Sequence, residues 1–187
     1  MDNLGAKIGT ALRKLRQEKG WSLDMAAKYT GVSKAMLGQI ERGESIPTIA
    51  ILWKIASGFK TPFSTFIDER CFDEASPVHR TASLQHLHPE DDKIRISPLF
   101  LYDQGLSFEV FLIELLPGCE HLSPPHKGGV IEHAIVIEGQ IEILANGSWH
   151  QLKTHEGLRF NANQAHGYRN RSAEKATFHD IVHYRNA

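Results

Sequence analysis

Apolar side chains in the first 68 residues recur at the three- and four-residue spacing of amphipathic helices. Ile8, Leu12 and Leu15 follow this spacing within Leu4–Lys19, which predicts a first helix that ends at Gly20. The same criteria predict four more short helices: 23–29 with Ser22 as N-cap, 34–42 with Ser33 as N-cap, Thr48 to Gly58, and a last one opened by Thr61-Pro62. Five short helices of this kind can form a small independent core.

Beyond residue 94 the pattern changes to short runs of strand-forming residues between turn residues. Phe108–Leu115 is such a run and stops before Pro117-Gly118, while Asn146-Gly147 is a strong hairpin signal. Further strands are predicted at Val130–Glu138, Gln140–Leu144, Leu158–Asn161, His166–Arg169 and Ala176–His183. Several short strands at close spacing predict a β-sandwich or a small barrel.

The segment between the two patterns, residues 69–95, shows little periodicity and contains Cys71, two prolines and the acidic run Glu90-Asp91-Asp92. It is predicted to be a linker with an arm that leads into the β part. We therefore expect a helical domain at 1–68, this linker and arm at 69–95, and a β domain at 96–187.

The segment Gly31–Gly43 has the features of the second helix of a helix-turn-helix. Gly31 suits a left-handed turn, Ser33 is a preferred N-cap, and Gly43 stands where a left-handed residue ends the helix. One face carries Leu37, Ile40 and Glu41, and the opposite face carries Ala35, Gln39 and Arg42. A buried face opposite an outward face of small and polar side chains is what a reader of the major groove needs. The segment therefore predicts DNA binding.

Residues 1–68 resemble the lambda-repressor-like (XRE) regulators. The resemblance is carried by Ser22-Leu23, Ala26-Ala27, Gly31-Val32-Ser33, Leu37, Gln39-Ile40-Glu41-Arg42-Gly43 and Pro47-Thr48. It implies a DNA-binding set of Ser22, Ser33, Lys34, Ala35, Met36, Gln39 and Arg42. Within this set it places Lys34, Ala35 and Gln39 on bases and the two serines on phosphates, and it implies an internal Arg16–Glu41 ion pair. Ala35 offers only apolar contact, for example to a thymine methyl, so the helix does not specify the operator.

Charge is distributed unevenly between the two halves. Residues 1–68 carry a net charge of +4 and the remainder −5, which together give the near-neutral total of −1. The basic half can neutralise phosphates of a DNA operator and the acidic half cannot. This asymmetry favours double-stranded DNA as the partner of the helical domain.

All histidines lie in the second part of the chain, and some have motif spacing. His126, Glu132 and Gly139 resemble the first motif of the cupin barrels (double-stranded β-helix or jelly-roll folds), and Gly157, His166 and Asn170 resemble the second. Gly128 stands where the family usually has another histidine, so the resemblance implies a metal set reduced to His126, Glu132 and His166. Three such ligands suit one divalent ion, zinc first, with an open position for water or effector. The alternative is a metal-free polar cavity that binds a small molecule directly.

The predicted effector pocket extends the metal set of His126, Glu132 and His166 by Arg159, Phe160 and Tyr168. Arg159 is a candidate partner for a carboxylate effector, with an exposed rim charge as the alternative. The two aromatic residues are candidates for the pocket or for the barrel core. His133 should point away from the interior by strand alternation. The remaining histidines of this region are expected on the surface or at strand ends: His121, His150, His155, His179 and His183.

The order of the two modules resembles bacterial XRE-type regulators with a C-terminal cupin sensor. Gly31–Phe59 together with His126–His133 is most similar to the bacterial sulfur-utilisation regulator group, which implies a small sulfur-containing amino acid as effector. A homodimer on a pseudo-palindromic operator is expected, with recognition helices about 34 Å apart. The alternatives are a metal-dependent cupin dioxygenase or isomerase fused to a DNA-binding domain, and a DNA-bound scaffold with a vestigial barrel. Gly128 and the complete helix-turn-helix argue against the enzyme.

Whole-chain features restrict the setting. No apolar run reaches membrane length and the first residues lack a signal-peptide core, so a cytoplasmic protein with no membrane partner is expected. Cys71 and Cys119 show no paired-motif spacing, which favours reduced thiols over a disulfide.

Overall fold

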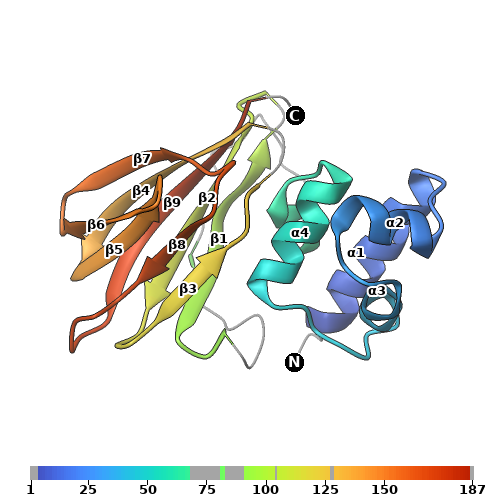
Figure 1. Ribbon diagram of the computed structural model, residues 1–187, viewed down its shortest axis with the longest axis horizontal. Helices are drawn as coiled ribbons and strands as arrows, with labels where there is room; N and C mark the ends of the chain where they lie inside the picture. The colour runs from blue at the N-terminus through green and yellow to red at the C-terminus, as the bar shows by residue number, and fades with distance from the viewer. Residues whose placement is uncertain (1–3, 68–80, 83–90, 104, 127–128, 186–187) are drawn as a thin grey trace.

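Four α-helices build the N-terminal part of the molecule and two β-sheets build the rest (Figure 1). The computed structural model describes residues 4–67, 81–82, 91–103, 105–126 and 129–185. Most of the predicted linker at 69–95, including Cys71, lies outside these residues, as does Gly128. The helices are α1 (Leu4–Glu18), α2 (Leu23–Thr30), α3 (Lys34–Glu41) and α4 (Ile49–Phe59). None of the described helices is long and apolar enough to cross a membrane.

Side-chain caps start three of these helices as the sequence predicts. The hydroxyls of Ser22, Ser33 and Thr48 accept the backbone amide three residues further on, at 3.1, 3.2 and 3.3 Å. Gly31 and Gly43 adopt the left-handed conformation, with φ of 69° and 70°, and turn the chain after α2 and α3. The helix-turn-helix is therefore set by local hydrogen bonds and backbone preferences.

The predicted end of α4 at Gly58 is wrong. The helix continues to Phe59, and Lys60 forms the left-handed cap, with φ of 54°. Gly58 lies inside the helix at the point where α4 crosses α2, because a Cβ atom there would lie only 2.6 Å from the Cα of Thr30. Glycine is required at this position by the contact with α2 and not by the end of the helix.

The predicted fifth helix is also wrong, since the described chain forms only a 3₁₀ turn there, η1 (Phe63–Phe66). In a 3₁₀ turn residues i and i+3 lie above one another. Phe63 and Phe66 therefore share one face, and both are fully buried. This tight turn packs both rings into the core in a segment too short for a regular helix.

The β part consists of two facing sheets and not of a closed barrel. One sheet has the strand order β1-β2-β9-β4-β7 and the other β3-β8-β5-β6. Because β7 pairs with β4 while β8 pairs with β3 and β5, no hydrogen-bonded ladder joins the sheets in the described part. The bounds are β1 Ile94–Asp103, β2 Phe108–Leu115, β3 Glu120–Ser123, β4 Val130–Glu138, β5 Gln140–Ala145, β6 Ser148–Lys153, β7 Gly157–Asn161, β8 His166–Arg169 and β9 Ala176–Tyr184.

Three strands of the described structure were not predicted from the sequence: β1, which contains Pro98, β3 and β6. Strands β3 and β6 each bury a single residue, Ser123 and Leu152, so neither shows an alternating apolar pattern. The hairpin that leads into β6 is confirmed. Asn146 and Gly147 both have positive φ, 50° and 76°, as a two-residue hairpin turn between right-twisted strands requires.

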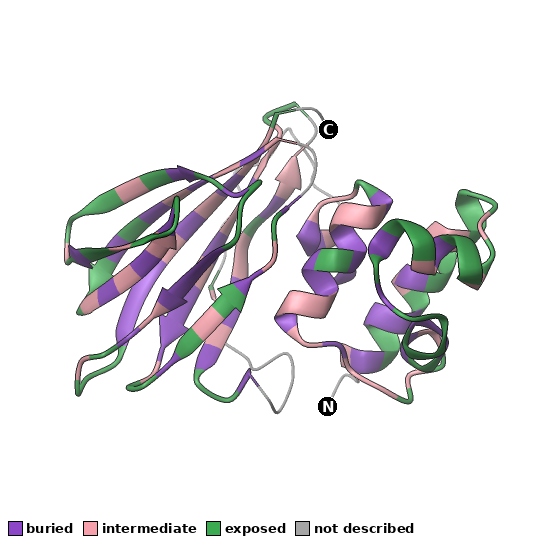
Figure 2. Ribbon diagram, in the orientation of Figure 1, coloured by how far each residue is buried: buried purple, intermediate pink, exposed green. Residues whose placement is uncertain are grey.

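Buried residues alternate with more exposed ones along strands such as β4 and β5, so that the two sheets bury the faces that they turn toward each other (Figure 2). Helix α4 lies between the sheets and the other helices (Figure 1). Glu109 on β2 accepts hydrogen bonds from the amides of Phe63, at 3.1 Å, and Ser64, at 2.9 Å. At the other end of α4, the amide of Ile49 donates to Asp91, at 3.0 Å. The DNA-binding part thus packs directly on the β part.

Candidate functional site

The outward face of α3 carries the predicted base-contacting residues. Leu37, Gly38 and Ile40 are buried against the other helices. The predicted DNA-facing residues of α3 and its C-cap are all exposed: Lys34, Ala35, Met36, Gln39 and Arg42. Ser22 and Ser33 are exposed as well and hold the first turns of α2 and α3. The recognition helix therefore presents one continuous polar and small-residue face to solvent.

Three ion pairs surround this helix and differ in burial. Arg16 of α1 donates two hydrogen bonds to the carboxylate of Glu41, at 2.6 and 2.8 Å, and so holds the end of α3. The family resemblance implies this ion pair. Lys34 pairs with Asp24 at 2.8 Å, and Arg42 pairs with the neighbouring Glu44 at 2.7 Å. These last two pairs are exposed and hence weak, so phosphates can replace the carboxylates at little cost.

The second site is a small buried cavity at the inner end of the β part, closed on one side by α4. Its volume is about 20 Å³. Apolar side chains form most of its walls, and the polar lining residues are His121, Ser123, His126, Glu132, Tyr168 and Asp180. Two walls come from the DNA-binding part, Ile49 and Trp53 of α4. The cavity therefore lies at the contact between the two parts of the chain.

His126, Glu132 and His166 converge here with ligand atoms within 4.8 Å of one another, and each is almost fully buried. The Oε1 atom of Glu132 lies 3.2 Å from Nε2 of His126 and 3.5 Å from Nε2 of His166. Tetrahedral ligands about 2.1 Å from a zinc ion lie roughly 3.4 Å apart. The three residues brought together from β4, β8 and the segment before β4 therefore fit a divalent metal.

Electrostatics keep the ligands in the form that binds metal. Burial lowers the pKa of His126, so its ring is neutral. Burial opposes ionisation of Glu132, but the histidines and Tyr168 outweigh it and lower the pKa of this carboxyl. Nδ1 of His166 lies 2.9 Å from the carbonyl oxygen of Gln164, which leaves Nε2 to face Glu132. Nε2 of His166 has no hydrogen-bond partner among the described residues, as an open ligand atom would.

Tyr168 supports the cluster from behind. Its hydroxyl donates a short hydrogen bond to Oε2 of Glu132 and lies 3.5 Å from Asp180. Burial and the neighbouring Glu132 raise the pKa of Asp180 well above its usual range. The predicted pocket residue Tyr168 is therefore in the cavity, where it orients Glu132.

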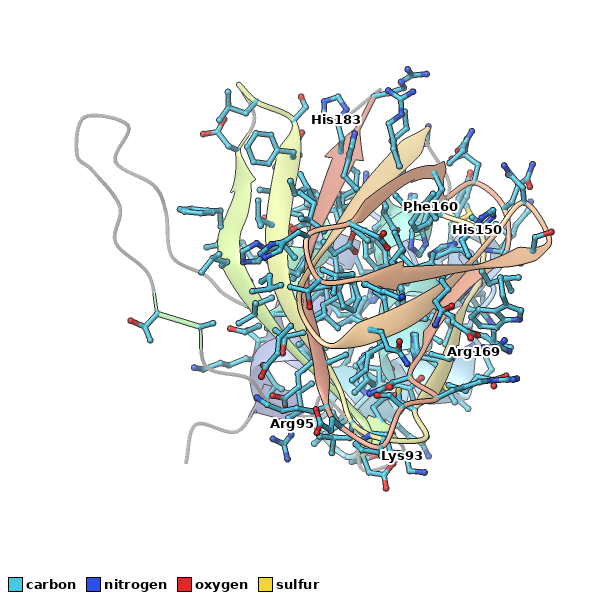
Figure 3. All side chains as sticks on the ribbon, turned by 90° about the vertical axis from the view of Figure 1, so that its left-hand side faces the viewer. Lys93, Arg95, His150, Phe160, Arg169 and His183 are labelled. Atoms are coloured by element: carbon cyan, nitrogen blue, oxygen red, sulfur yellow. The ribbon has the colours of Figure 1, made fainter. Side chains whose placement is uncertain are left out.

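Other predicted pocket residues lie elsewhere. Arg159 is exposed on β7 and does not line this cavity. Phe160 (labelled in Figure 3) is buried but does not line the cavity. The centroid of its ring lies 5.6 Å from that of the ring of His166. His133 is only partly buried and alternates with Glu132, as predicted. His150 is exposed on β6, and His183 lies near the end of β9 (Figure 3).

Three of the cavity residues that sequence reasoning missed are informative. His121 was expected on the surface or at a strand end, but β3 turns it inward, where its Nε2 is buried with no hydrogen-bond partner among the described residues and burial lowers its pKa. Asp180 lies on β9 among apolar residues of alternating burial, so an inward carboxylate there was detectable in the sequence. Trp53 carried no signal, because it belongs to the other domain and looks like an ordinary core residue of α4.

A basic helix-turn-helix packed on a β-sandwich with a buried His/Glu cluster defines a transcription regulator with an attached cupin domain. Family models agree, with a helix-turn-helix (HTH) matched at residues 12–66 and a cupin domain at residues 111–182. The chain belongs to the family of the HTH-type transcriptional regulator SutR of Escherichia coli strain K12. It is 47% identical to SutR over 184 residues, which are 98% of each chain.

Other relatives agree with this assignment. The HTH-type transcriptional regulator PuuR of Escherichia coli strain K12 is 25% identical over 92% of each chain. The crystal structure of an HTH_3 family transcriptional regulator from Vibrio cholerae superposes with a TM-score of 0.83, at 42% identity over 98% of each chain. The predicted class, a helix-turn-helix transcriptional regulator with a C-terminal cupin domain, is confirmed, and these relatives support it over the alternative of an enzyme.

Proposed function

We propose that this regulator binds a pseudo-palindromic operator as a homodimer and that the cavity around His126 is its sensor. The observation that carries the proposal is the burial of three convergent ligand groups directly beneath a helix of the DNA-binding part. Two recognition helices would enter successive major grooves about 34 Å apart. A ligand that binds one arrangement of the dimer better than another would change operator affinity by that difference.

We infer that His126, Glu132 and His166 hold one divalent ion, with zinc the best match to two imidazoles and a carboxylate. Bound there, the ion would act as a Lewis acid with one position left for an exogenous ligand. Zinc accepts sulfur ligands readily, so a small sulfur-containing amino acid is the effector class that we propose. Tyr168 would keep Glu132 oriented toward the ion, and His166 is held by its bond to the carbonyl of Gln164.

The DNA-reading role is tested by gel-shift titration on duplexes selected from a random-sequence pool. Gln39→Ala should relax base preference at one position by about 1–3 kcal/mol. Lys34→Ala should likewise relax base preference, and because it also removes a positive charge it should weaken salt-dependent binding and reduce the salt slope by about one unit. The matched control is Lys153→Ala, an exposed lysine on β6. Unchanged affinity and preference in both α3 variants would refute the assignment.

The metal is tested by elemental analysis of the protein after exposure to zinc and removal of excess ions. About one ion per chain is expected for the wild type and for His150→Ala, whose histidine is exposed on β6. His166→Ala should lose it, since only two ligands would remain. Equal zinc content in the His166 and His150 variants, or no zinc in the wild type, would contradict the metal site and favour a cavity that works without metal.

A further inference from the structure

We propose that Trp53 is the movable wall of the sensor cavity, so that an effector enters only by displacing α4 from His126. The proposal rests on the sensor role of this cavity and specifies how a bound molecule reaches the DNA-binding part. Trp53 belongs to α4, yet its ring stacks on the ring of His126, with centroids 3.9 Å apart and planes inclined by 19°. One tryptophan therefore belongs to the core of the DNA-binding part and covers a candidate metal ligand.

The size of the cavity shows why this wall must move. A volume of about 20 Å³ corresponds to roughly one or two water molecules. A metal ion fits that space as it stands, but an amino acid has several times as many atoms as the cavity can hold. Any effector of that size has to enlarge the cavity by moving one of its walls.

The walls differ in how firmly they are held. Most lining residues belong to strands in hydrogen-bonded ladders, where displacement would break backbone pairs on both sides. Among the described lining residues, three lie outside the sheets: Ile49 and Trp53 of α4, and His126 in the segment before β4, whose amide donates to the carbonyl of Ala162, at 2.8 Å. Trp53 is fixed by ring contacts, to His126 and to Phe63 at 4.6 Å, and such contacts can be exchanged for contacts with a ligand. Helix α4 is therefore the wall that moves at least cost.

Displacement of α4 would also carry the rest of the DNA-binding part with it. Gly58 packs so closely on Thr30 that α4 and α2 have no room to slide past each other. Helix α2 is in turn the first helix of the helix-turn-helix and is joined to α3 by the turn at Gly31. Movement of Trp53 away from His126 therefore repositions the recognition helix relative to the β part.

Polar contacts hold the start of α4 and the following turn η1 to residues that precede or belong to the sheets. Asp91 accepts the amide of Ile49 at the start of α4, and Glu109 accepts two amides of η1 beyond its end. Trp53 lies between these two anchors. A ligand that lifts Trp53 must therefore loosen one anchor or the other, which gives the contact two discrete arrangements.

The gate is tested by chemical modification of histidines with diethylpyrocarbonate, a reagent larger than the cavity, followed by mass spectrometry. In the metal-free wild type, modification of His126 should be slow, and in Trp53→Ala several-fold faster. His150, which is exposed, is the internal standard, and Trp149→Ala is the matched control because Trp149 stacks on Arg169, at 3.8 Å. Added indole, the side chain that the variant lacks, should slow the reaction again. Equal His126 rates in Trp53→Ala and the wild type, or no protection by indole, would overturn the gate.

Coupling to DNA is measured on the same proteins with a duplex selected by the wild-type chain. Trp53→Ala should change operator affinity by roughly fivefold or more, and indole should reverse the change, while Trp149→Ala behaves as wild type. Unchanged affinity in Trp53→Ala would refute the coupling. Failure of the wild type to select any duplex would instead refute the proposed function, and the modification experiment would still decide the gate.

Discussion

Replacement of Gly58 by alanine tests how closely α4 and α2 are packed. Alanine is favoured over glycine inside a helix by about 1 kcal/mol, so helix propensity alone predicts a more stable protein. The structure predicts the opposite. A Cβ atom on residue 58 would lie 2.6, 2.7 and 2.9 Å from the Cα, Cγ2 and N atoms of Thr30. Non-bonded carbon atoms normally lie about 3.5–4.0 Å apart.

The magnitude follows from these contacts. Two of the three atoms belong to the backbone of Thr30, so no side-chain rotation removes the overlap and the helices must separate by about 1 Å. Overpacking of this kind costs about 1–3 kcal/mol, and backbone contacts belong at the upper end. After the gain in helix propensity, Gly58→Ala should destabilise the protein by about 2 kcal/mol. In a chain of this size the Tm should fall by roughly 4–8 °C.

Thermal unfolding followed by far-ultraviolet circular dichroism measures the effect. The matched control is Gly38→Ala in α3, where the new Cβ would meet only the mobile end of Arg42, at 3.1 Å, and Leu23, at 3.8 Å. This variant keeps the gain in propensity, so its Tm should rise by roughly 2–4 °C. A Tm of Gly58→Ala at or above that of the wild type would show that the close helix crossing does not exist.

Three further predictions concern buried polar groups. Glu41→Ala leaves the guanidinium of Arg16 without its carboxylate and should lower the free energy of unfolding in urea by about 2 kcal/mol. Glu44→Ala, in an exposed pair, should leave it nearly unchanged, and equal losses would contradict this. Tyr168→Phe removes the hydroxyl that orients Glu132 and should weaken zinc binding about 10-fold in competition with a chelator; an unchanged affinity would show that this bond is not needed. Burial raises the pKa of the Glu109 carboxyl in the folded protein above its value in the unfolded chain, about 4.5, so protonation of this carboxyl favours folding. This contribution to the free energy of unfolding is fully present below pH 4.5 and is lost as the pH rises through the folded pKa. In Glu109→Gln this part of the fall in Tm with pH should vanish, and parallel Tm curves would contradict the assignment.

Much of the structure of the candidate DNA-reading site was predictable from sequence because its determinants are local. Ser22 and Ser33 cap amides three residues away, and Gly31 turns the chain within its own peptide unit. The exposed face of α3 follows from helical spacing alone. Strands with alternating burial, such as β4 and β5, were predicted for the same reason. Strands β3 and β6 were missed because each buries only one side chain.

The cavity was predictable only in part. The resemblance of His126, Glu132 and His166 to the two cupin motifs identified the group that converges, although β4 and β8 belong to different sheets and His126 precedes β4. The inward turn of His121 and the raised pKa of Asp180 depend on which strands pair and what surrounds them. Neither pairing nor environment is encoded within a few residues of these positions.

By itself the sequence determined the class of this protein, a DNA-binding regulator with a cupin domain, and the candidate ligands of its sensor. Capping, helical spacing and motif spacing act over a few residues and are legible in the chain. Only the tertiary structure decided that Gly58 is a crossing point and that Trp53 closes the cavity over His126. Such contacts join residues far apart in the chain, and their energies depend on close packing between elements that no local pattern specifies.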